Sequence, residues 1–403
     1  QAEDGIRDVE RSRGLGDVYK RQRAIHAGQV PDPQTGAIIA PVYTASTYVQ
    51  EGIGKNKGFI YSRTANPTRL TLEACLADIE GAQAAFAFPS GLAAAATVLE
   101  LMDAGSHLVV HDDLYGGIYR LFADVKRRSS GHQVSFVDFS DLDSVRKSIK
   151  EETKMLWFET PSNPLLQIVD LEKIAVLSKS TNAISVCDNT FASPYCQRPL
   201  EHGIDLVVHS ATKFLNGHSD LLAGVAAISG HAPEGMVDQL RFLQNALGSV
   251  LSPNDCATLL RSLKTLPVRM ERHFHNAECI ANFLFENQSR LGIEYINYPG
   301  LKDHPGHEIA KSQMHGYGSI ITIVVDGGLK RADTVLQRCS LFHFAVSLGG
   351  VESLIQHPSS MTHAAIPRER REEIGLVDGL IRLSVGLESI EDLIGDLEQA
   401  LQY

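Results

Sequence analysis

The sequence predicts an α/β protein with a large domain built on a mostly parallel seven-stranded sheet and a smaller C-terminal α+β domain. Between residues 64 and 257, seven short apolar runs alternate with helical patterns, which is typical of a parallel sheet covered by helices on both faces. After Cys256 the alternation gives way to longer helical stretches. Because 403 residues exceed what one hydrophobic core usually serves, we expect two domains.

The predicted elements follow in chain order. Residues 1–22 form a polar leader without clear periodicity, which we expect to be non-native or disordered. Residues 23–63 form an N-terminal arm, extended and punctuated by glycine and proline between 31 and 58. The large domain, 64–257, is predicted to have strands at 84–88, 108–111, 134–137, 155–159, 184–188, 206–210 and 225–228. In the second domain, 258–403, we expect helices at 257–263 and 268–286, a strand at 319–325 and helices from there to the end.

Composition excludes several classes of protein. Hydrophobic residues make up 43% of the chain and charged residues 21%, as in ordinary soluble globular proteins. The net charge of −11 opposes binding to nucleic acid, which depends on basic side chains. The six cysteines are scattered without C-x-x-C spacing, so we predict no zinc site and no disulfide framework, and a reducing cytoplasm fits best. No apolar run approaches the ~20 residues that cross a bilayer, so no membrane partner is expected.

One lysine stands out, because an apolar strand at 206–210 leads directly into Ser210-x-Thr212-Lys213. A lysine held at the end of a buried strand, beside two hydroxyls that can bind an anion, is well placed to form an imine with a phosphorylated aldehyde. The alternative is a solvated surface lysine, which is the commoner role for a lysine taken at random. The surrounding residues favour pyridoxal phosphate.

Three other segments supply what such a cofactor needs. Asp188 ends the strand at 184–188, so its carboxylate should point into the ligand crevice and could pair with a ring nitrogen. Ser90-Gly91 joins a strand to an alanine-rich helix, whose first amides could bind phosphate. Tyr115 follows the strand at 108–111, where its ring could stack on a pyridine face or simply pack.

These residues lie in motifs that resemble the Cys/Met-metabolism group of pyridoxal-phosphate enzymes, which includes cystathionine γ-synthases, cystathionine γ-lyases and methionine γ-lyases. The resemblance runs from about Ala24 to the C-terminus. Its motifs are Tyr61-Ser62-Arg63-x-x-Asn66-Pro67-Thr68, Ser90-Gly91, Tyr115-Gly116-Gly117, Pro161-Ser162-Asn163-Pro164, Asp188-Asn189-Thr190-Phe191, Ser210-Ala211-Thr212-Lys213, Ser347-Leu348-Gly349-Gly350-Val351-Glu352-Ser353, Met361-Thr362-His363 and Arg382-Leu383-Ser384-Val385-Gly386. The family implies pyridoxal-phosphate fold type I, similar to aspartate aminotransferase, and a homotetramer built as a dimer of dimers.

The resemblance also implies roles for individual residues. Lys213 would hold the cofactor as an aldimine and carry protons through quinonoid intermediates, with Tyr115 and Asp188 as the other catalytic residues. The expected phosphate ligands are the amides of Gly91 and Leu92, the hydroxyls of Ser210 and Thr212, and Tyr61 and Arg63 from a neighbouring subunit. The substrate α-carboxylate would bind Arg382, with help from Asn163 and Ser347. His209 and His363 are interpreted as structural.

The resemblance favours an amino-acid substrate attacked at its γ carbon, as in cystathionine γ-synthases and γ-lyases. Methionine γ-lyase and cystathionine β-lyase activities remain alternatives. Val346 stands where the γ-synthases and γ-lyases usually carry a glutamate, as it does in methionine γ-lyases, although those tend to have a cysteine where this chain has Gly117. Losing that carboxylate should favour apolar thioethers over substrates that carry a second amino group.

Three other classes compete with this interpretation. A nucleotide-binding dehydrogenase would fit the sheet pattern, but the chain lacks a clear G-x-G-x-x-G after its first strand. A phosphate-binding-loop enzyme is disfavoured because no G-x-x-x-x-G-K-[ST] occurs. A regulatory protein that keeps the cofactor but catalyses nothing is the non-enzymatic alternative, since fold never guarantees function.

Overall fold

The computed structural model describes residues 21–364 and 366–402, so the predicted leader lies outside the described residues except for its last two positions. The larger unit is built on a seven-stranded sheet of order β1-β7-β6-β5-β4-β2-β3. Its strands are β1 (Ala84–Phe88), β2 (His107–His111), β3 (Gln133–Val137), β4 (Thr153–Glu159), β5 (Ile184–Asp188), β6 (Leu206–Ser210) and β7 (Gly224–Ile228). Strands β2 to β6 pair in parallel, and β7 lies antiparallel between β1 and β6. The predicted mostly parallel seven-stranded sheet is confirmed.

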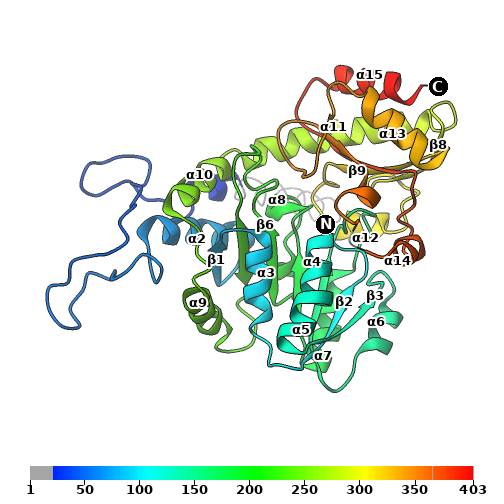
Figure 1. The fold of residues 1–403 in the computed structure, drawn as a ribbon. Helices are drawn as coiled ribbons and strands as arrows, with labels where there is room; N and C mark the ends of the chain where they lie inside the picture. The colour runs from blue at the N-terminus through cyan, green and yellow to red at the C-terminus, as the bar shows by residue number, and fades with distance from the viewer. Residues whose placement is uncertain (1–20, 365, 403) are drawn as a thin grey trace, which may run out of the picture.

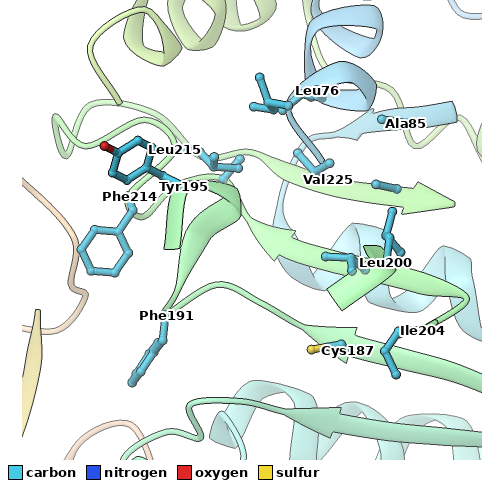
Figure 2. Packing of buried hydrophobic residues seen from close by; sticks show 14 of the residues in the cluster. Leu76, Ala85, Cys187, Phe191, Tyr195, Leu200, Ile204, Phe214, Leu215 and Val225 are labelled. Carbon is cyan, nitrogen blue, oxygen red and sulfur yellow. The ribbon is translucent and has the colours of Figure 1, made fainter. Parts of the chain in front are cut away.

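Helices pack on both faces of this sheet (Figure 1). They are α2 (Pro67–Glu80), α3 (Gly91–Leu99), α4 (Gly116–Arg120), α5 (Arg127–Ser130), α6 (Leu142–Ser148), α7 (Leu171–Thr181), α8 (Ser193–Cys196), α9 (Met236–Leu247) and α10 (Pro253–Leu263). Because successive side chains of a strand point to opposite faces, Ala85 packs with the core on the α2 side while Phe86 packs with the core on the α3 side. Figure 2 shows part of the first core, where Leu76 of α2 and Val225 of β7 lie near Ala85.

The helix starts follow from capping residues in the sequence. Asn66 caps α2 by accepting hydrogen bonds from the next two helical amides, and Pro67 stands at the first position, where its missing amide costs nothing. Ser90 caps α3 by accepting a hydrogen bond from the Ala93 amide at 3.0 Å. This cap fixes where the chain turns from β1 into α3, at the carboxyl edge of the sheet.

The smaller unit contains a five-stranded sheet of order β10-β11-β12-β9-β8. Its strands are β8 (Ile293–Asn297), β9 (Ile320–Val325), β10 (His343–Phe344), β11 (Leu354–Gln356) and β12 (Leu380–Ser384), and its helices are α12 (His307–Gln313), α13 (Gly328–Arg338), α14 (Arg368–Glu373) and α15 (Ile390–Leu401). All neighbouring strands are antiparallel except β10 and β11. The expectation of helices alone after residue 325 is therefore wrong. The strands β10 and β11 are too short to show a period, and Arg382 interrupts the apolar run of β12.

The long helix α11 (Leu266–Glu286) connects the two units. The core of the larger unit continues through Met270, and that of the smaller unit begins at Ala277. The boundary that we expected after residue 257 lies inside α10, which packs against α2 of the larger unit, and it stays a prediction. The apolar residues of α10 and α11 recur at helical spacing throughout. The sequence pattern therefore gave no signal for the point at which α11 passes from one hydrophobic core to the other.

The segment from 31 to 58 runs away from the body of the molecule and is drawn in dark blue in Figure 1. Its apolar side chains are exposed, among them Ile39, Val49 and Ile53. Within the described residues, no helix combines the length and apolar character needed to cross a bilayer.

Candidate active site

All residues assigned to the site from the sequence, except Tyr61 and Arg63, line one cavity of about 370 Å³. These are Gly91, Leu92, Tyr115, Asn163, Asp188, Ser210, Thr212, Lys213, Val346, Ser347 and Arg382. They come from the carboxyl edge of the large sheet and from the second unit. The parallel strands β2, β4, β5 and β6 all end at this edge, so residues that follow different strands meet there.

Lys213 lies three residues beyond β6, with its amine directed into the cavity wall formed by the second unit. Its Nζ donates a hydrogen bond to Ser347 Oγ at 2.6 Å. Burial, followed by the nearby charge of Arg382, lowers the pKa of Lys213 from 10.5 to about 8. A substantial fraction of this amine is therefore neutral near pH 8 and able to act as a nucleophile or base.

Asp188 is a buried carboxylate at the end of β5. Its Oδ1 accepts hydrogen bonds from the Thr190 amide at 3.0 Å and the Thr190 hydroxyl at 2.5 Å. The same hydroxyl accepts a hydrogen bond from the Ser210 amide at 2.9 Å, which ties β5 to β6. Burial raises the pKa of Asp188, while the bonds from Thr190 act in the opposite direction. A buried carboxylate of this kind is best stabilised by a cationic partner in the cavity.

The N-terminus of α3 forms the anion-binding side of the cavity. The first amides of a helix have no partner within it, and Gly91 and Leu92 line the cavity together with Ser210 and Thr212. Gly91 is required by this close approach, since a Cβ there would lie 3.0 Å from the Cα and Cβ of Ser210. Thr212 exchanges two hydrogen bonds with the backbone of Ala223, which fixes its hydroxyl in the wall.

Arg382 is fully buried on β12 and reaches the cavity from the second unit. Its Nη1 donates to Asn163 Oδ1 and its Nη2 donates to the Ser347 carbonyl, each at 2.7 Å. Its Nε is buried and has no hydrogen-bond partner among the described residues. Burial lowers the pKa of Arg382 to about 9. A buried guanidinium group with a free donor is suited to bind a carboxylate that enters the cavity.

Ser347 adopts an unusual backbone conformation, with a positive φ of 95°. Non-glycine residues in this region cost of order 1–3 kcal/mol and are concentrated at functional sites. Here the conformation lets Ser347 face Lys213 with its hydroxyl and Arg382 with its carbonyl. The strain is therefore stored where the two units meet around the cavity.

Tyr115 is positioned by a second buried acid, Glu159, which ends β4. The Tyr115 amide donates to Glu159 Oε2 at 3.0 Å. Gly117 leaves room for the aromatic ring, because a Cβ there would lie 2.4 Å from a ring carbon of Tyr115. Burial, and then the charge of Asp188, raises the pKa of Glu159 well above its usual range.

Val346 and Leu222 line the cavity with apolar side chains that remain largely exposed. No carboxylate replaces the glutamate that the resembled enzymes usually carry at the position of Val346.

Tyr61 and Arg63 lie on the surface of their own chain rather than in its cavity. Arg63 stacks near the Tyr61 ring, 5.7 Å from its centroid, and donates a hydrogen bond to the Asn245 carbonyl at 2.8 Å. The expectation that these residues complete the site of a neighbouring subunit stays a prediction.

The two histidines interpreted as structural are both buried and hydrogen-bonded. His209 pairs with Glu80 of α2, with 2.5 Å between Nε2 and Oε1. His363 bonds the Asn163 carbonyl through Nε2 at 3.0 Å.

Sequence reasoning did not assign a role to Thr190, Glu159 or Thr362, which also line the cavity. Thr190 and Thr362 stood within recognised motifs, and the Asp188-x-Thr190 spacing is a typical signal for a hydroxyl that caps a carboxylate. Glu159 ends a predicted strand just as Asp188 does, and this position was the signal that could have found it.

The residues present fit pyridoxal phosphate. A buried acid for a ring nitrogen, a lysine of lowered pKa, a tyrosine face and a helix N-terminus for a phosphate converge on one cavity. The open donor on Arg382 adds a place for the carboxylate of an amino acid.

Comparison with known proteins agrees with this assignment. Residues 21–402 match the family model of Cys/Met metabolism PLP-dependent enzymes. A cystathionine beta-lyase of Coxiella burnetii is 54% identical over 379 residues, which cover 94% of this chain and 97% of that protein. A cystathionine gamma-lyase of Bacillus subtilis is 46% identical over 385 residues, covering 96% of this chain and 100% of that protein. The crystal structure of cystathionine gamma-lyase from Lactobacillus plantarum complexed with L-serine superposes with a TM-score of 0.90 at 43% identity, covering 94% of this chain and 98% of that one.

Proposed function

Since the chain belongs to the Cys/Met-metabolism family of pyridoxal-phosphate-dependent enzymes, we propose that it breaks C–S bonds of sulfur amino acids, acting at the γ carbon. The observation that supports this most directly is the convergence of the Lys213 amine and the open donor of Arg382 on one cavity. The first can move a proton at the α carbon while the second holds the α-carboxylate. Together they orient an amino acid with its reacting bonds toward Lys213.

Pyridoxal phosphate, when bound, supplies an aldehyde that joins amino groups and a ring that accepts the electrons of the α carbon. The amine of Lys213 would hold this group and, once freed by a substrate amine, would take the α-proton. Cleavage at the γ carbon requires a second proton to leave, from the β carbon, and the same amine is placed to move it. The Ser347 hydroxyl, which accepts from Lys213 at 2.6 Å, steers the freed amine.

Asp188 would support this chemistry by favouring a positive charge on the ring nitrogen of the cofactor. A carboxylate about 3 Å from a pyridinium, at an effective dielectric of ~20, provides at most about 5 kcal/mol of attraction before desolvation is subtracted. The bonds from Thr190 hold the carboxylate in place. Glu159 positions the backbone of Tyr115, whose ring would then cover one face of the cofactor.

The apolar wall around Val346 and Leu222 bears on which sulfur amino acid enters. A distal ammonium group placed against these side chains would lose its hydration without gaining a partner. We therefore expect thioethers with an apolar end, such as methionine, to compete well with cystathionine.

We propose that the arm and the proposed phosphate ligands at its end, Tyr61 and Arg63, contact a neighbouring copy of the chain within the homotetramer that the family resemblance implies. The exposed apolar side chains of residues 31–58 would be covered by a second copy of the chain. The same contact would bring Tyr61 and Arg63 to the cavity of the neighbour. A monomer would then have an incomplete site. Diluting the protein below the dissociation constant of the assembly should therefore release the cofactor.

The test is to supply cystathionine to the purified holoenzyme and identify the keto acid. Cleavage at the γ carbon gives 2-oxobutyrate, cysteine and ammonia, whereas β-elimination gives pyruvate, homocysteine and ammonia. Methionine should give 2-oxobutyrate, methanethiol and ammonia. A synthase would instead form cystathionine and succinate from O-succinylhomoserine and cysteine.

The control is Lys213→Ala, which should abolish all of these products. Borohydride reduction followed by peptide mapping should label Lys213, and a label elsewhere would contradict the proposal. Pyruvate as the main keto acid would favour the second candidate, a β-lyase, for which the 54% identity to the Coxiella burnetii cystathionine beta-lyase argues. The absence of any keto acid or thioether product would contradict both.

A further inference from the structure

Asp113 is a buried carboxylate between β2 and α4 that faces the loop carrying Asn163. Its Oδ2 accepts hydrogen bonds from the Ser162 hydroxyl and, at 3.1 Å, from the Leu165 amide. The Ser162 hydroxyl in turn accepts from the Gln167 amide at 2.8 Å. Asn163 therefore lies between two residues that are bound to one carboxylate oxygen.

Asn163 is the link from this loop to the substrate side of the cavity. Its Oδ1 accepts the hydrogen bond from Arg382 Nη1 at 2.7 Å, and its carbonyl bonds His363 at 3.0 Å. A small shift of the loop would move Oδ1 away from the guanidinium plane. Arg382 would then lose one of the two bonds that set its orientation.

We infer that Asp113 is a positioning residue for the substrate carboxylate, because its charged oxygen holds the 162–165 loop where Asn163 can align Arg382. The inference rests on the proposed role of Arg382. Hydrogen bonds to an ionised acceptor are roughly twice as strong as those to a neutral one, so the loop is held best when Asp113 is charged. That charge is costly, since Oδ1 of Asp113 is buried and has no hydrogen-bond partner within the described residues.

The protonation of Asp113 provides a readout that a purely structural role would not give. Burial raises the pKa of Asp113 from 3.8 to about 6. The groups that face it are His111, Asp112, Glu159, Ser162 and Leu165. Of these, Asp112 is itself paired with Arg370 of α14 at 3.0 Å. Asp113 is therefore charged above about pH 6 and neutral below it, so carboxylate affinity should fall as the pH drops through this value.

The experiment measures binding of butyrate to the holoenzyme by calorimetry between pH 5.5 and 8. Butyrate carries a carboxylate but no amine that could react with the cofactor. Asp113→Asn keeps an acceptor oxygen and removes the charge. Ser162→Ala removes one of the two hydrogen bonds that Asp113 Oδ2 accepts. Ser135→Ala is the matched control, because the Ser135 hydroxyl also bonds a buried side chain, that of His107 at 2.9 Å, but Ser135 belongs to β3 and not to the 162–165 loop.

At pH 8 we expect Asp113→Asn and Ser162→Ala each to raise the butyrate dissociation constant about three- to tenfold, as loss of charge assistance implies. The double variant should raise the butyrate dissociation constant by less than the product of the two single-variant factors, because both substitutions act on the same contact between Asp113 and the loop. Beyond the change that butyrate's own protonation imposes, the unaltered protein should lose about two- to threefold in affinity between pH 8 and 5.5, because about a quarter of Asp113 is still charged at pH 5.5. Asp113→Asn should show only the change due to butyrate. With a turned-over amino acid, KM should rise and kcat should change less than about twofold.

Retained visible absorbance of the bound cofactor would show that each variant is folded. Normal butyrate binding by both variants would overturn the inference and leave the role of Arg382 intact. If the unaltered protein bound no butyrate and Arg382→Gln bound amino acids normally, the proposed carboxylate site would fail and the inference with it. A pH dependence that Asp113→Asn shares fully with the unaltered protein would also overturn the inference.

Discussion

The lowered pKa of Lys213 predicts how fast the cofactor-free protein captures pyridoxal phosphate. Burial is the larger cause and the charge of Arg382 the smaller, and together they bring the pKa from 10.5 to about 8. At pH 7 about one such amine in ten is neutral, compared with about one in three thousand for an ordinary lysine. Because only the neutral amine attacks an aldehyde, the reactive fraction is about three-hundredfold larger than at an unperturbed lysine.

The assay is stopped-flow mixing of apoenzyme with saturating pyridoxal phosphate, followed at the visible band near 420 nm. The rate should rise about tenfold per pH unit up to pH 7, bend near pH 8 and level off by pH 9. Lys213→Ala should give no band. Arg382→Gln should move the bend to higher pH, because a positive charge that disfavours the ammonium form of Lys213 has been removed.

Two results would refute this reasoning. A rate that keeps rising tenfold per unit to pH 10 would mean that Lys213 titrates as an ordinary lysine. An unmoved bend in Arg382→Gln would mean that the guanidinium charge does not act on the amine. Ionisation of pyridoxal phosphate itself is common to all variants and cancels in the comparison.

Three further predictions test individual residues. Asp188→Asn keeps an acceptor for Thr190 but loses the charge, so kcat should fall by two orders of magnitude or more while cofactor absorbance is retained; near-normal turnover would contradict the pairing. Thr190→Val removes the hydroxyl that binds Asp188 and the Ser210 amide, and should lower kcat roughly ten- to hundredfold in steady-state assays. An unchanged kcat would show that the Asp188 carboxylate does not need this hydroxyl. Val346→Glu should shift the ratio of kcat/KM values toward cystathionine over methionine, whereas Val346→Gln should not; equal ratios in both variants would rule out a charge effect.

Much of the site was predictable because its residues follow buried parallel strands. Lys213 and Asp188 come at or just after the ends of β6 and β5, whose apolar sequences are short and well bounded. Strand direction then places both at one edge of the sheet. Gly91 was predictable for a different reason, since a strand, a glycine turn and a helix in succession leave amides free at the helix start. These inferences needed only local pattern.

What the sequence could not predict depends on packing between distant segments. The strands β10 and β11 have two and three residues, too few for a period to appear, and they form because β12 offers a partner edge. Glu159 accepts a hydrogen bond from the Tyr115 amide, which lies 44 positions away in the chain. The contact between Asp113 and Ser162 joins residues 49 positions apart, and neither has a spacing that would indicate it.

The helix α11 explains how a site shared by two units keeps its geometry. Arg269, in the part of α11 that packs on the larger unit, donates at 2.6 Å to the carbonyl of Phe214, the residue after Lys213. One turn later, His273 Nδ1 lies 2.7 Å from the Val385 carbonyl at the end of the strand that carries Arg382. Burial lowers the pKa of His273 to about 4, so this ring is neutral at physiological pH and donates one N–H to the carbonyl.

Both side chains are buried and lie four positions apart on one helix, so they occupy the same face. A single rigid element thus fixes the backbone beside the Lys213 amine relative to the backbone beside the Arg382 guanidinium. Any rotation between the units that preserved α11 would have to break one of these two bonds. One helical turn therefore fixes the spacing between the backbone segments that carry the proposed proton carrier and the proposed carboxylate site, while the loops that line the cavity orient the two side chains.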